Sequence, residues 1–377
     1  MSLPQKFINE VKHSIDIVDI ISGYIDVEDN KACCPFHDEK TPSFRIHQAD
    51  QFYHCFGCDA QGDVFKFITE HTNNTFFEAV SDMASLSGLE LPQLEDNSKQ
   101  MAEYTSNKSQ AVRSHKKLYT SQLAASHYKS RKITGKTAKT FMLGYNSNDQ
   151  LVFPVRNPQG KVSGFSYRNM SSEGPKYINS KASCTFDKSR TLYGLYELLQ
   201  SVKKPESIIV FEGQIDVLTA HQNGIKNVVG TLGTAMTDKH FHELFKRTDH
   251  VILCFDADTA GQKAMIKAIK NGLSQLKGLR KISVVRLPEG KDPDDLIKEN
   301  LNEFLDLLSK HTTIYDTMIK GFSKQVNMDT FEGPSHLIHL ALPFLKEITD
   351  KVTKERFMNK LCEISDLEYK QLYKALS

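Results

Sequence analysis

The sequence predicts a multidomain protein that combines α/β and α+β architecture. Three features of its 377 residues lead to this prediction: a compact cysteine-rich segment near the amino end, regular alternation of strands and helices after Pro205, and a helical stretch over residues 298–377. Strands that alternate with helices are typical of a parallel sheet covered on both faces. A chain of this length has room for two or three such domains.

The first predicted domain spans residues 1–94. It begins with a helical apolar pattern, continues through a cysteine-rich segment, and ends with the amphipathic segments FKFITEHT and FEAVSDMASLSG. Gly88 stands where a helix would end in a left-handed cap residue. Residues 95–111 are polar, so they are interpreted as a flexible linker.

Three further segments follow the linker. Residues 112–206 contain short strands and turns, among them an Asn-Pro-Gln-Gly turn between two apolar runs, and predict a mixed α/β subdomain. Residues 207–297 alternate the strands IIVF, NVVG, HVILCF and KISVVRL with helices, and predict a parallel α/β subdomain. Residues 298–377 predict a helical subdomain without strands.

The charge of the chain is unevenly distributed. The formal net charge is only +2, but residues 104–190 contain sixteen Lys or Arg and three Asp or Glu, so this window carries +13 and the remainder −11. A basic block of this kind favours contact with nucleic acid. The alternative is a solvated lysine surface, and charge alone does not distinguish the two.

Two classes of protein are excluded by the composition. The amino terminus has no apolar signal segment and no apolar run approaches the length of a membrane span, so we expect a cytoplasmic protein without membrane contact. Seven cysteines without a secretion signal argue against a disulfide framework. Cys184, Cys254 and Cys362 are isolated in the sequence and are interpreted as inert thiols.

The cysteine-rich segment has the spacing of a metal site. Cys34 and His37 form one pair separated by two residues, and Cys55 and Cys58 form another. Zinc takes four nitrogen or sulfur ligands, and a closed Cys3His set stabilises a fold without catalysing a reaction. The sequence therefore predicts one structural zinc ion. Cys33 could compete with Cys34, which we favour because it keeps the spacing to His37.

Acidic residues follow three strands of the predicted parallel sheet. They are Glu212 and Asp216 after the first strand, Asp256 and Asp258 after the second, and Asp292, Asp294 and Asp295 after the third. Functional groups in such sheets gather at the carboxyl ends of strands, and converging carboxylates favour Mg²⁺ or Mn²⁺. Two such ions suit phosphoryl transfer. The alternative is that these acids cap helices or face solvent.

Together these motifs resemble the DnaG-type bacterial primases over essentially the whole chain. CPFHDEKTPSF, YHCFGC and GDVFKF look like the family's zinc-binding domain, a zinc ribbon that contacts template DNA. FPVRNPQGKVSGFSYR, PKYINS and LYGLYE are similar to the basic half of its RNA polymerase domain. FEGQIDVL, TLGTAMT, FDADTAGQKA and LPEGKDPDDL resemble its Toprim half. The resemblance implies a DNA primase, a nucleotidyltransferase that makes short RNA primers from ribonucleoside triphosphates on single-stranded DNA.

The resemblance also implies roles for individual residues. Glu212 matches the acid proposed to bind metal and to assist deprotonation of the attacking hydroxyl, and Asp256 and Asp258 match the metal-binding pair. The secondary acids, with less defined roles, are Asp216, Asp292 and Asp294. The cations that match those holding template or nucleotide phosphates are Arg168, Lys176 and Lys188.

Among the departures of the chain from the family pattern, two bear on function. Thr140 stands where the family usually has an Arg, and Lys136 or Lys139 could substitute. The sequence also ends about where the polymerase domain of the family ends, so the usual helicase-binding domain is expected to be absent. Two other functions remain open: a Toprim-type nuclease or topoisomerase that cuts phosphodiesters, and a non-catalytic module that binds single-stranded DNA.

Overall fold

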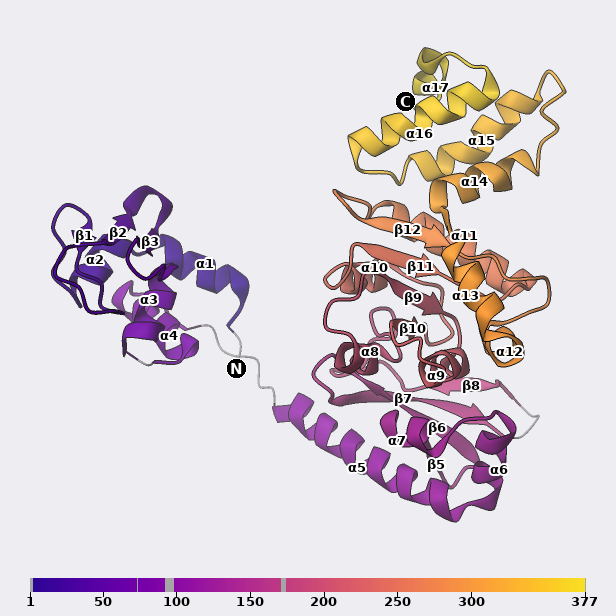
Figure 1. Cartoon of the computed structure of the whole chain (residues 1–377), viewed down its shortest axis with the longest axis horizontal. Coiled ribbons are helices and arrows are strands. Elements are labelled where there is room, and N and C mark those ends of the chain that lie inside the picture. Colours follow the sequence, from indigo (N-terminus) through magenta and orange to yellow (C-terminus); the bar gives the residue numbers. More distant parts are fainter. Residues whose placement is uncertain (1–2, 73, 92–97, 171–173, 377) are drawn as a thin grey trace. The chain divides into compact units, whose positions relative to one another are not determined.

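The chain folds into two compact units, residues 1–98 and 99–377 (Figure 1). The computed structural model describes residues 3–72, 74–91, 98–170 and 174–376. No helix among these residues is long and apolar enough to cross a membrane. Both units contain helices and strands, in agreement with the predicted multidomain α/β and α+β class.

The first unit packs four helices against a small antiparallel sheet. Its sheet has the order β1-β2-β3-β4. The elements are α1 (Gln5–His13), α2 (Ile17–Ser22), β1 (Lys31–Ala32), β2 (Phe44–His47), the 3-10 helix η1 (Gln48–Asp50), β3 (Phe52–Cys55), β4 (Gln61–Gly62), α3 (Val64–Thr72) and α4 (Phe76–Leu86).

Aromatic side chains fill the core of the first unit. Phe44 of β2 and Tyr53 of β3 are fully buried, and their rings stack with centroids 4.9 Å apart. Phe67 of α3 meets both rings edge to face. Gly88 has a φ of +67° after α4, which confirms the predicted left-handed cap. β2 and β3 pair antiparallel, with Phe44 opposite Cys55. Cys55 is the last residue of β3, so the Cys55–Cys58 pair lies at the end of this strand.

The predicted flexible linker over residues 95–111 is wrong for its described part. Residues 98–111 belong to helix α5 (Ser98–Thr120), and residues 95–97 lie outside the described residues. Ala111 is fully buried, and the amide of Asn107 donates to the carbonyls of Val162 and Ser163. The polar sequence misled the interpretation because these side chains hydrogen-bond the neighbouring sheet instead of facing only water.

The amino-terminal part of the second unit contains an antiparallel sheet, which we call sheet B, with the order β5-β6-β7-β8. Gly160, with a φ of +83°, closes the predicted turn between β6 and β7. The elements of this part are α6 (Gln122–Ser130), α7 (Gly135–Thr140), β5 (Gly144–Tyr145), β6 (Gln150–Arg156), β7 (Val162–Asn169), β8 (Tyr177–Asn179) and α8 (Leu195–Ser201).

A second sheet, called sheet C, follows with the order β10-β9-β11-β12-β13. Its first four strands are parallel, as predicted, and β13 adds an antiparallel edge. The elements are β9 (Ile208–Phe211), α9 (Gln214–Gln222), β10 (Val228–Gly230), α10 (Asp238–Leu244), β11 (His250–Leu253), α11 (Thr259–Leu273), β12 (Lys281–Val284), α12 (Pro293–Glu299), α13 (Leu301–Ser309) and β13 (Thr312–Thr313).

Both faces of sheet C are buried, because successive side chains of a strand point to opposite faces. Ile208 and Val210 of β9 join the cluster that contains the carboxyl-terminal helices. Ile209 and Phe211 join the cluster that contains sheet B residues such as Phe153. The two subdomains on either side of the sheet therefore share its core.

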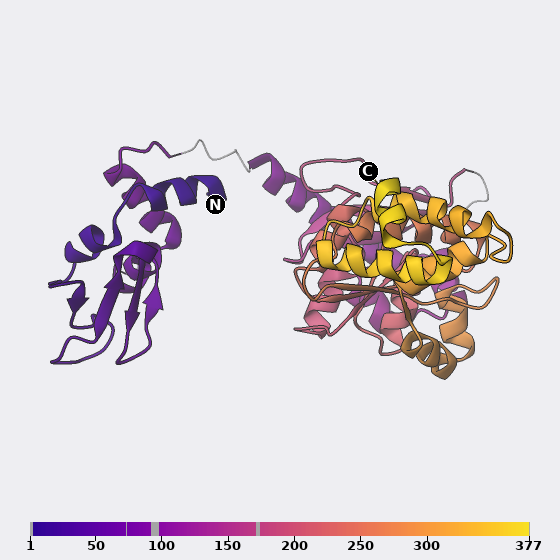
Figure 2. The same ribbon diagram turned by 90° about the horizontal axis from the view of Figure 1, so that it is seen from above.

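The carboxyl-terminal helices lie together as one group in both views (orange to yellow in Figures 1 and 2). They are α14 (Ile314–Ser323), α15 (Gly333–Leu345), α16 (Lys351–Ser365) and α17 (Tyr369–Leu376). The prediction of a helical end is confirmed except for β13, whose two residues are too few to give a strand pattern.

Candidate metal centres

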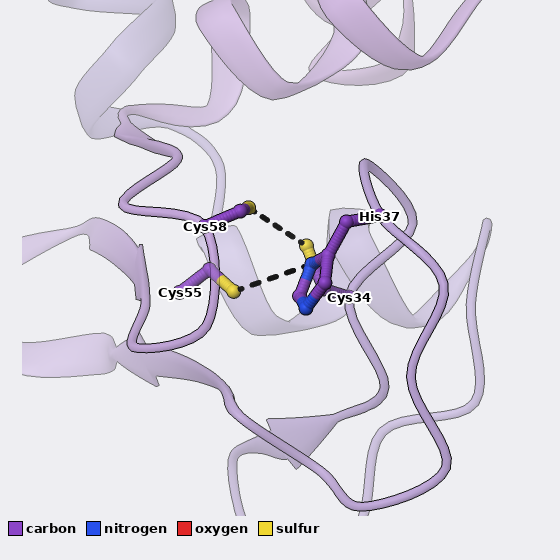
Figure 3. Close-up of side chains that lie close together, drawn as sticks. All are labelled: Cys34, His37, Cys55 and Cys58. Carbon is purple, nitrogen blue, oxygen red and sulfur yellow. Dashed lines mark hydrogen bonds between the residues drawn. The ribbon is translucent and has the colours of Figure 1, made fainter.

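The four predicted zinc ligands come together in the first unit (Figure 3). The Sγ atoms of Cys34 and Cys58 are 3.8 Å apart, and Cys55 Sγ is 3.8 Å from His37 Nδ1. A tetrahedron with metal–sulfur distances of about 2.3 Å has edges of about 3.8 Å. The separation of the four side chains therefore fits one tetrahedral zinc ion, whereas Cys33 is exposed and lies outside this cluster.

Each ligand pair, Cys34–His37 and Cys55–Cys58, folds as a tight turn that points a backbone N–H group at the first cysteine sulfur. Phe36 N lies 3.4 Å from Cys34 Sγ, and Gly57 N lies 3.3 Å from Cys55 Sγ. Burial raises the pKa of the Cys55 thiol, but the contact with Ser43 and hydrogen bonds from the backbone N–H groups of Cys58 and Gly57 outweigh burial and lower this pKa to about 7. Burial raises the pKa of the Cys34 thiol to about 12, so the backbone donors favour the thiolate of a zinc ligand at Cys55.

Glu39 joins the two halves of this site. Its carboxylate accepts hydrogen bonds from Cys34 N at 2.6 Å and Ser43 Oγ at 2.5 Å, and lies 3.3 Å from His37 Nε2. A carboxylate on the distal nitrogen of a histidine ligand fixes the tautomer and the ring orientation. Sequence analysis missed Glu39, although an acid two residues after a predicted histidine ligand is a signal for this role.

The acids of the second unit meet at one edge of sheet C. Strands β9, β11 and β12 are parallel neighbours, so their carboxyl ends lie side by side. The acids Glu212, Asp256 and Asp292 each follow one of these strands. The structure thus brings the three predicted groups of carboxylates to a common edge.

Glu212 and Asp256 form the centre of the acid cluster. Among the described residues, Glu212 Oε1 and Asp256 Oδ1 are buried oxygens without a hydrogen-bond partner. Burial and the Asp256 carboxylate raise the pKa of Glu212 to about 7, and burial, Asp292 and Asp258 raise the pKa of Asp256 to about 6. Half-buried carboxylates that repel one another and each keep one buried oxygen without a partner fit a divalent cation, whose charge would relieve both costs.

Asp258 and Asp292 each cap a helix at this edge. Asp258 accepts a 2.6 Å hydrogen bond from Gly261 N at the start of α11, and Asp292 accepts a 2.7 Å bond from Asp295 N at the start of α12. Each bond involves one carboxylate oxygen. Both acids therefore cap helices, as the alternative interpretation proposed. The two caps also orient the side chains at the edge where Glu212 and Asp256 lie.

Asp216 and Asp294 are buried in a hydrogen-bond network that joins α9 to α12. Asp216 accepts from Gly213 N at 3.1 Å and from Asp294 N at 3.2 Å, and burial raises its pKa well above the usual range. Asp294 accepts from Thr219 Oγ1 at 2.5 Å and from Lys298 Nζ at 2.6 Å. The network holds the loop that presents Asp292.

Gly261 has no side chain, which lets α11 lie close to the loop of Asp256. Replacement of Gly261 is therefore expected to disturb the acids. A Cβ at position 261 would lie 2.2 Å from the Asp256 carbonyl oxygen and 2.9 Å from Glu212 Oε1. We expect Gly261→Ala to displace both acids and to weaken Mn²⁺ binding, measured by calorimetry, at least about tenfold. Gly321→Ala in α14 is the control, because a Cβ there meets no atom within 4 Å. Equal Mn²⁺ affinity for the two variants would contradict this role for Gly261.

The three predicted phosphate-binding cations occupy different environments. Lys176 is exposed, and its positive charge lowers the pKa of Asp256. Burial and the neighbouring acids raise that pKa by more. Arg168 is buried, and its guanidinium donates to the Tyr177 hydroxyl at 3.0 Å. Lys188 is half-buried in the loop before α8, where its carbonyl oxygen lies 3.1 Å from His240 Nε2. The structure thus places Lys176 beside the acids and Lys188 beside α10.

Comparison with protein families gives the class of each part. Residues 3–99 match the CHC2 zinc finger family, residues 147–199 match the amino-terminal domain of the DNA primase catalytic core, and residues 209–297 match the Toprim-like family. The zinc-finger match and the Cys3His cluster indicate a zinc site in the first unit. The Toprim match indicates a divalent-metal site in the second, so the fold and the acids define a zinc-ribbon protein with a Toprim half.

Relatives of known name extend the similarity to the whole chain. The DNA primase of Legionella pneumophila is 33% identical over 98% of this chain and 72% of its own length. The Aquifex aeolicus primase structure, which contains zinc-binding and RNA polymerase domains, is 31% identical, covers 99% of both chains and has a TM-score of 0.64. The chain belongs to the DnaG-type DNA primase family. It spans 64% of the length of the Pseudomonas putida DNA primase, which is 31% identical.

The expected absence of a helicase-binding domain is wrong. Residues 318–368 match the DnaB-helicase binding domain of primase. These residues form most of α14, all of α15 and all of α16. The sequence predicted their helices, but an amphipathic helical pattern reports only burial against neighbouring helices. It therefore gave no sign of which protein the outer faces of these helices would meet.

Proposed function

We propose that this chain is a DNA primase that synthesises short RNA primers on single-stranded DNA from ribonucleoside triphosphates. The observation that carries the proposal is the pair of buried, unpartnered carboxylate oxygens on Glu212 and Asp256, at the edge where the Toprim-like strands end. The zinc unit, the basic half and the names of the relatives support the same function.

Each group of residues has a place in this reaction. Glu212, Asp256 and Asp258 would hold Mg²⁺ or Mn²⁺, which would activate the attacking 3′-hydroxyl and stabilise the departing pyrophosphate. Glu212 would also assist deprotonation of the 3′-hydroxyl, and a bound cation would lower its pKa from the raised value of the metal-free site. Arg168, Lys176 and Lys188 would hold phosphates of template or nucleotide. Cys34, His37, Cys55 and Cys58 would bind one structural zinc ion.

Two partners follow from the proposal. Single-stranded DNA is the template, and the excess of sixteen basic over three acidic residues in residues 104–190 suits its phosphates. A DnaB-type replicative helicase is the protein partner that the match over residues 318–368 supports. Mixing the full chain with such a helicase and measuring co-elution tests that partner.

A direct assay separates primase from nuclease. The full chain is incubated with single-stranded DNA, labelled ribonucleoside triphosphates and either Mg²⁺ or Mn²⁺. We expect short labelled RNA and intact DNA, because the metal-binding acids lie in one unit with the basic half. Shortened DNA without RNA would favour the Toprim-type nuclease, and DNA binding without either product would favour a binding module.

A further inference from the structure

Asp294 lies near two cations, although one is enough to neutralise it. The carboxylate is 2% exposed, and Lys298, four residues later on α12, lies 2.6 Å from it. The Nη1 atom of Arg131 lies 3.6 Å away, beyond the length of a good hydrogen bond. Lys298 alone therefore satisfies the buried charge, and Arg131 adds a positive charge that this acid does not require.

Arg131 comes from the basic half of the unit and faces the acid edge. It directly follows α6, and its side chain is 35% exposed whereas that of Lys298 is 17% exposed. Its positive charge acts on Asp292 and on Tyr177, and lowers the pKa of both against the larger effect of burial. The guanidinium thus lies between sheet B and the acids that end sheet C, and it remains accessible to a ligand.

An unsatisfied group, His127, lies in α6 four residues before Arg131. Among the described residues, His127 Nε2 is a buried nitrogen without a hydrogen-bond partner. Burial lowers the pKa of His127, and the positive charges of Arg168 and Arg131 lower it further, so both guanidinium groups act on this imidazole. A neutral ring with an unpartnered nitrogen in the field of two cations is an environment that an anion would complete.

We propose that Arg131, with His127 beside it, binds the triphosphate of the incoming ribonucleotide and the pyrophosphate that leaves. This inference rests on the proposed function. A triphosphate must lie at the metal-binding acids, since its α-phosphorus is attacked there, and Arg131 lies next to Asp294 at that edge. A planar guanidinium can donate two parallel hydrogen bonds to phosphate oxygens. Neither the charge pattern nor the motifs of the sequence singled out Arg131.

The test separates nucleotide contact from template contact. We expect Arg131→Ala to raise the KM for ribonucleoside triphosphates, and the inhibition constant of pyrophosphate, by about tenfold or more. The Kd for single-stranded DNA should not change, and the melting temperature should stay near that of the parent because Lys298 still neutralises Asp294. Arg131→Lys should recover part of the loss, because it restores the charge without the planar group.

Lys129→Ala is the matched control, since Lys129 is an exposed cation on the same helix. An unchanged KM in Arg131→Ala would overturn the inference. A raised Kd for DNA with an unchanged KM would instead assign Arg131 to template phosphates. If the parent protein makes no primers, calorimetric titration with ATP and Mg²⁺ still compares Arg131→Ala with the parent, so failure of the function and failure of this site remain distinguishable.

Discussion

Glu212→Gln and Asp256→Asn are each expected to reduce primer synthesis at least about a hundredfold, because removal of one metal-binding carboxylate removes charge from the site of phosphoryl transfer. Folding should be retained. In the absence of metal, the raised pKa values mean that the ionised carboxylates destabilise the fold as the pH rises from about 4.5 through 7. A neutral amide removes that cost, so the melting temperature at pH 8 should equal or exceed that of the metal-free parent.

Primer yield in the presence of Mg²⁺ or Mn²⁺, and calorimetric melting in the same buffer without divalent metal, are the two measurements. Glu206→Gln is the matched control, because Glu206 is an exposed acid at the other end of β9. It should leave synthesis unchanged. Full activity in both Glu212→Gln and Asp256→Asn would exclude these residues from the metal site, whatever the control shows.

Cys55→Ser is expected to release zinc and to unfold the first unit. Cys34 and Cys55 belong to the hydrophobic core of that unit, so their metal joins the two turns to the sheet. Structural zinc contributes about 10 kcal/mol or more to small domains, which is as large as the whole stability usual for a domain of this size. The second unit should keep its own unfolding transition, because it is a separate compact unit.

Zinc content and hydrogen exchange over residues 30–60 measure this effect. Cys33→Ser is the control: Cys33 is adjacent in sequence to Cys34 but exposed, and we expect it to retain one zinc ion per chain. Loss of zinc from Cys33→Ser, with retention in Cys34→Ser, would reverse the ligand assignment. Retention of zinc in both Cys55→Ser and Cys58→Ser would exclude the site.

The sequence predicted those parts of the fold that depend on local patterns. The β9 strand was recognisable because Ile208, Val210 and their neighbours form an apolar run that ends at an acid. The zinc cluster was recognisable because its ligands occur in pairs two residues apart. In both cases one short segment carries the signal.

Long-range contacts could not be predicted in this way. The polar start of α5 becomes helical through hydrogen bonds to β7, fifty-five residues away for the Asn107–Val162 pair. In the sequence, the strands β5 to β12 lie between Arg131 and Asp294, so no short motif could indicate that the two side chains meet. The match of residues 318–368 to the DnaB-helicase binding domain of primase could not be predicted from burial patterns, because an amphipathic helix reports packing against its neighbours and not its family.

Short backbone pairings at the two borders of sheet C limit the addition of a strand from another protein. β13 pairs with Ser283 and Val284 of β12, and Gly230 of β10 exchanges two backbone hydrogen bonds of 2.9 Å with Tyr193. Proteins commonly recruit partners, or aggregate, by adding a strand to an open edge. Because β13 covers only part of β12 and Tyr193 pairs with β10 at Gly230, neither border of sheet C offers a long open strand, and addition of a strand from another protein is disfavoured there.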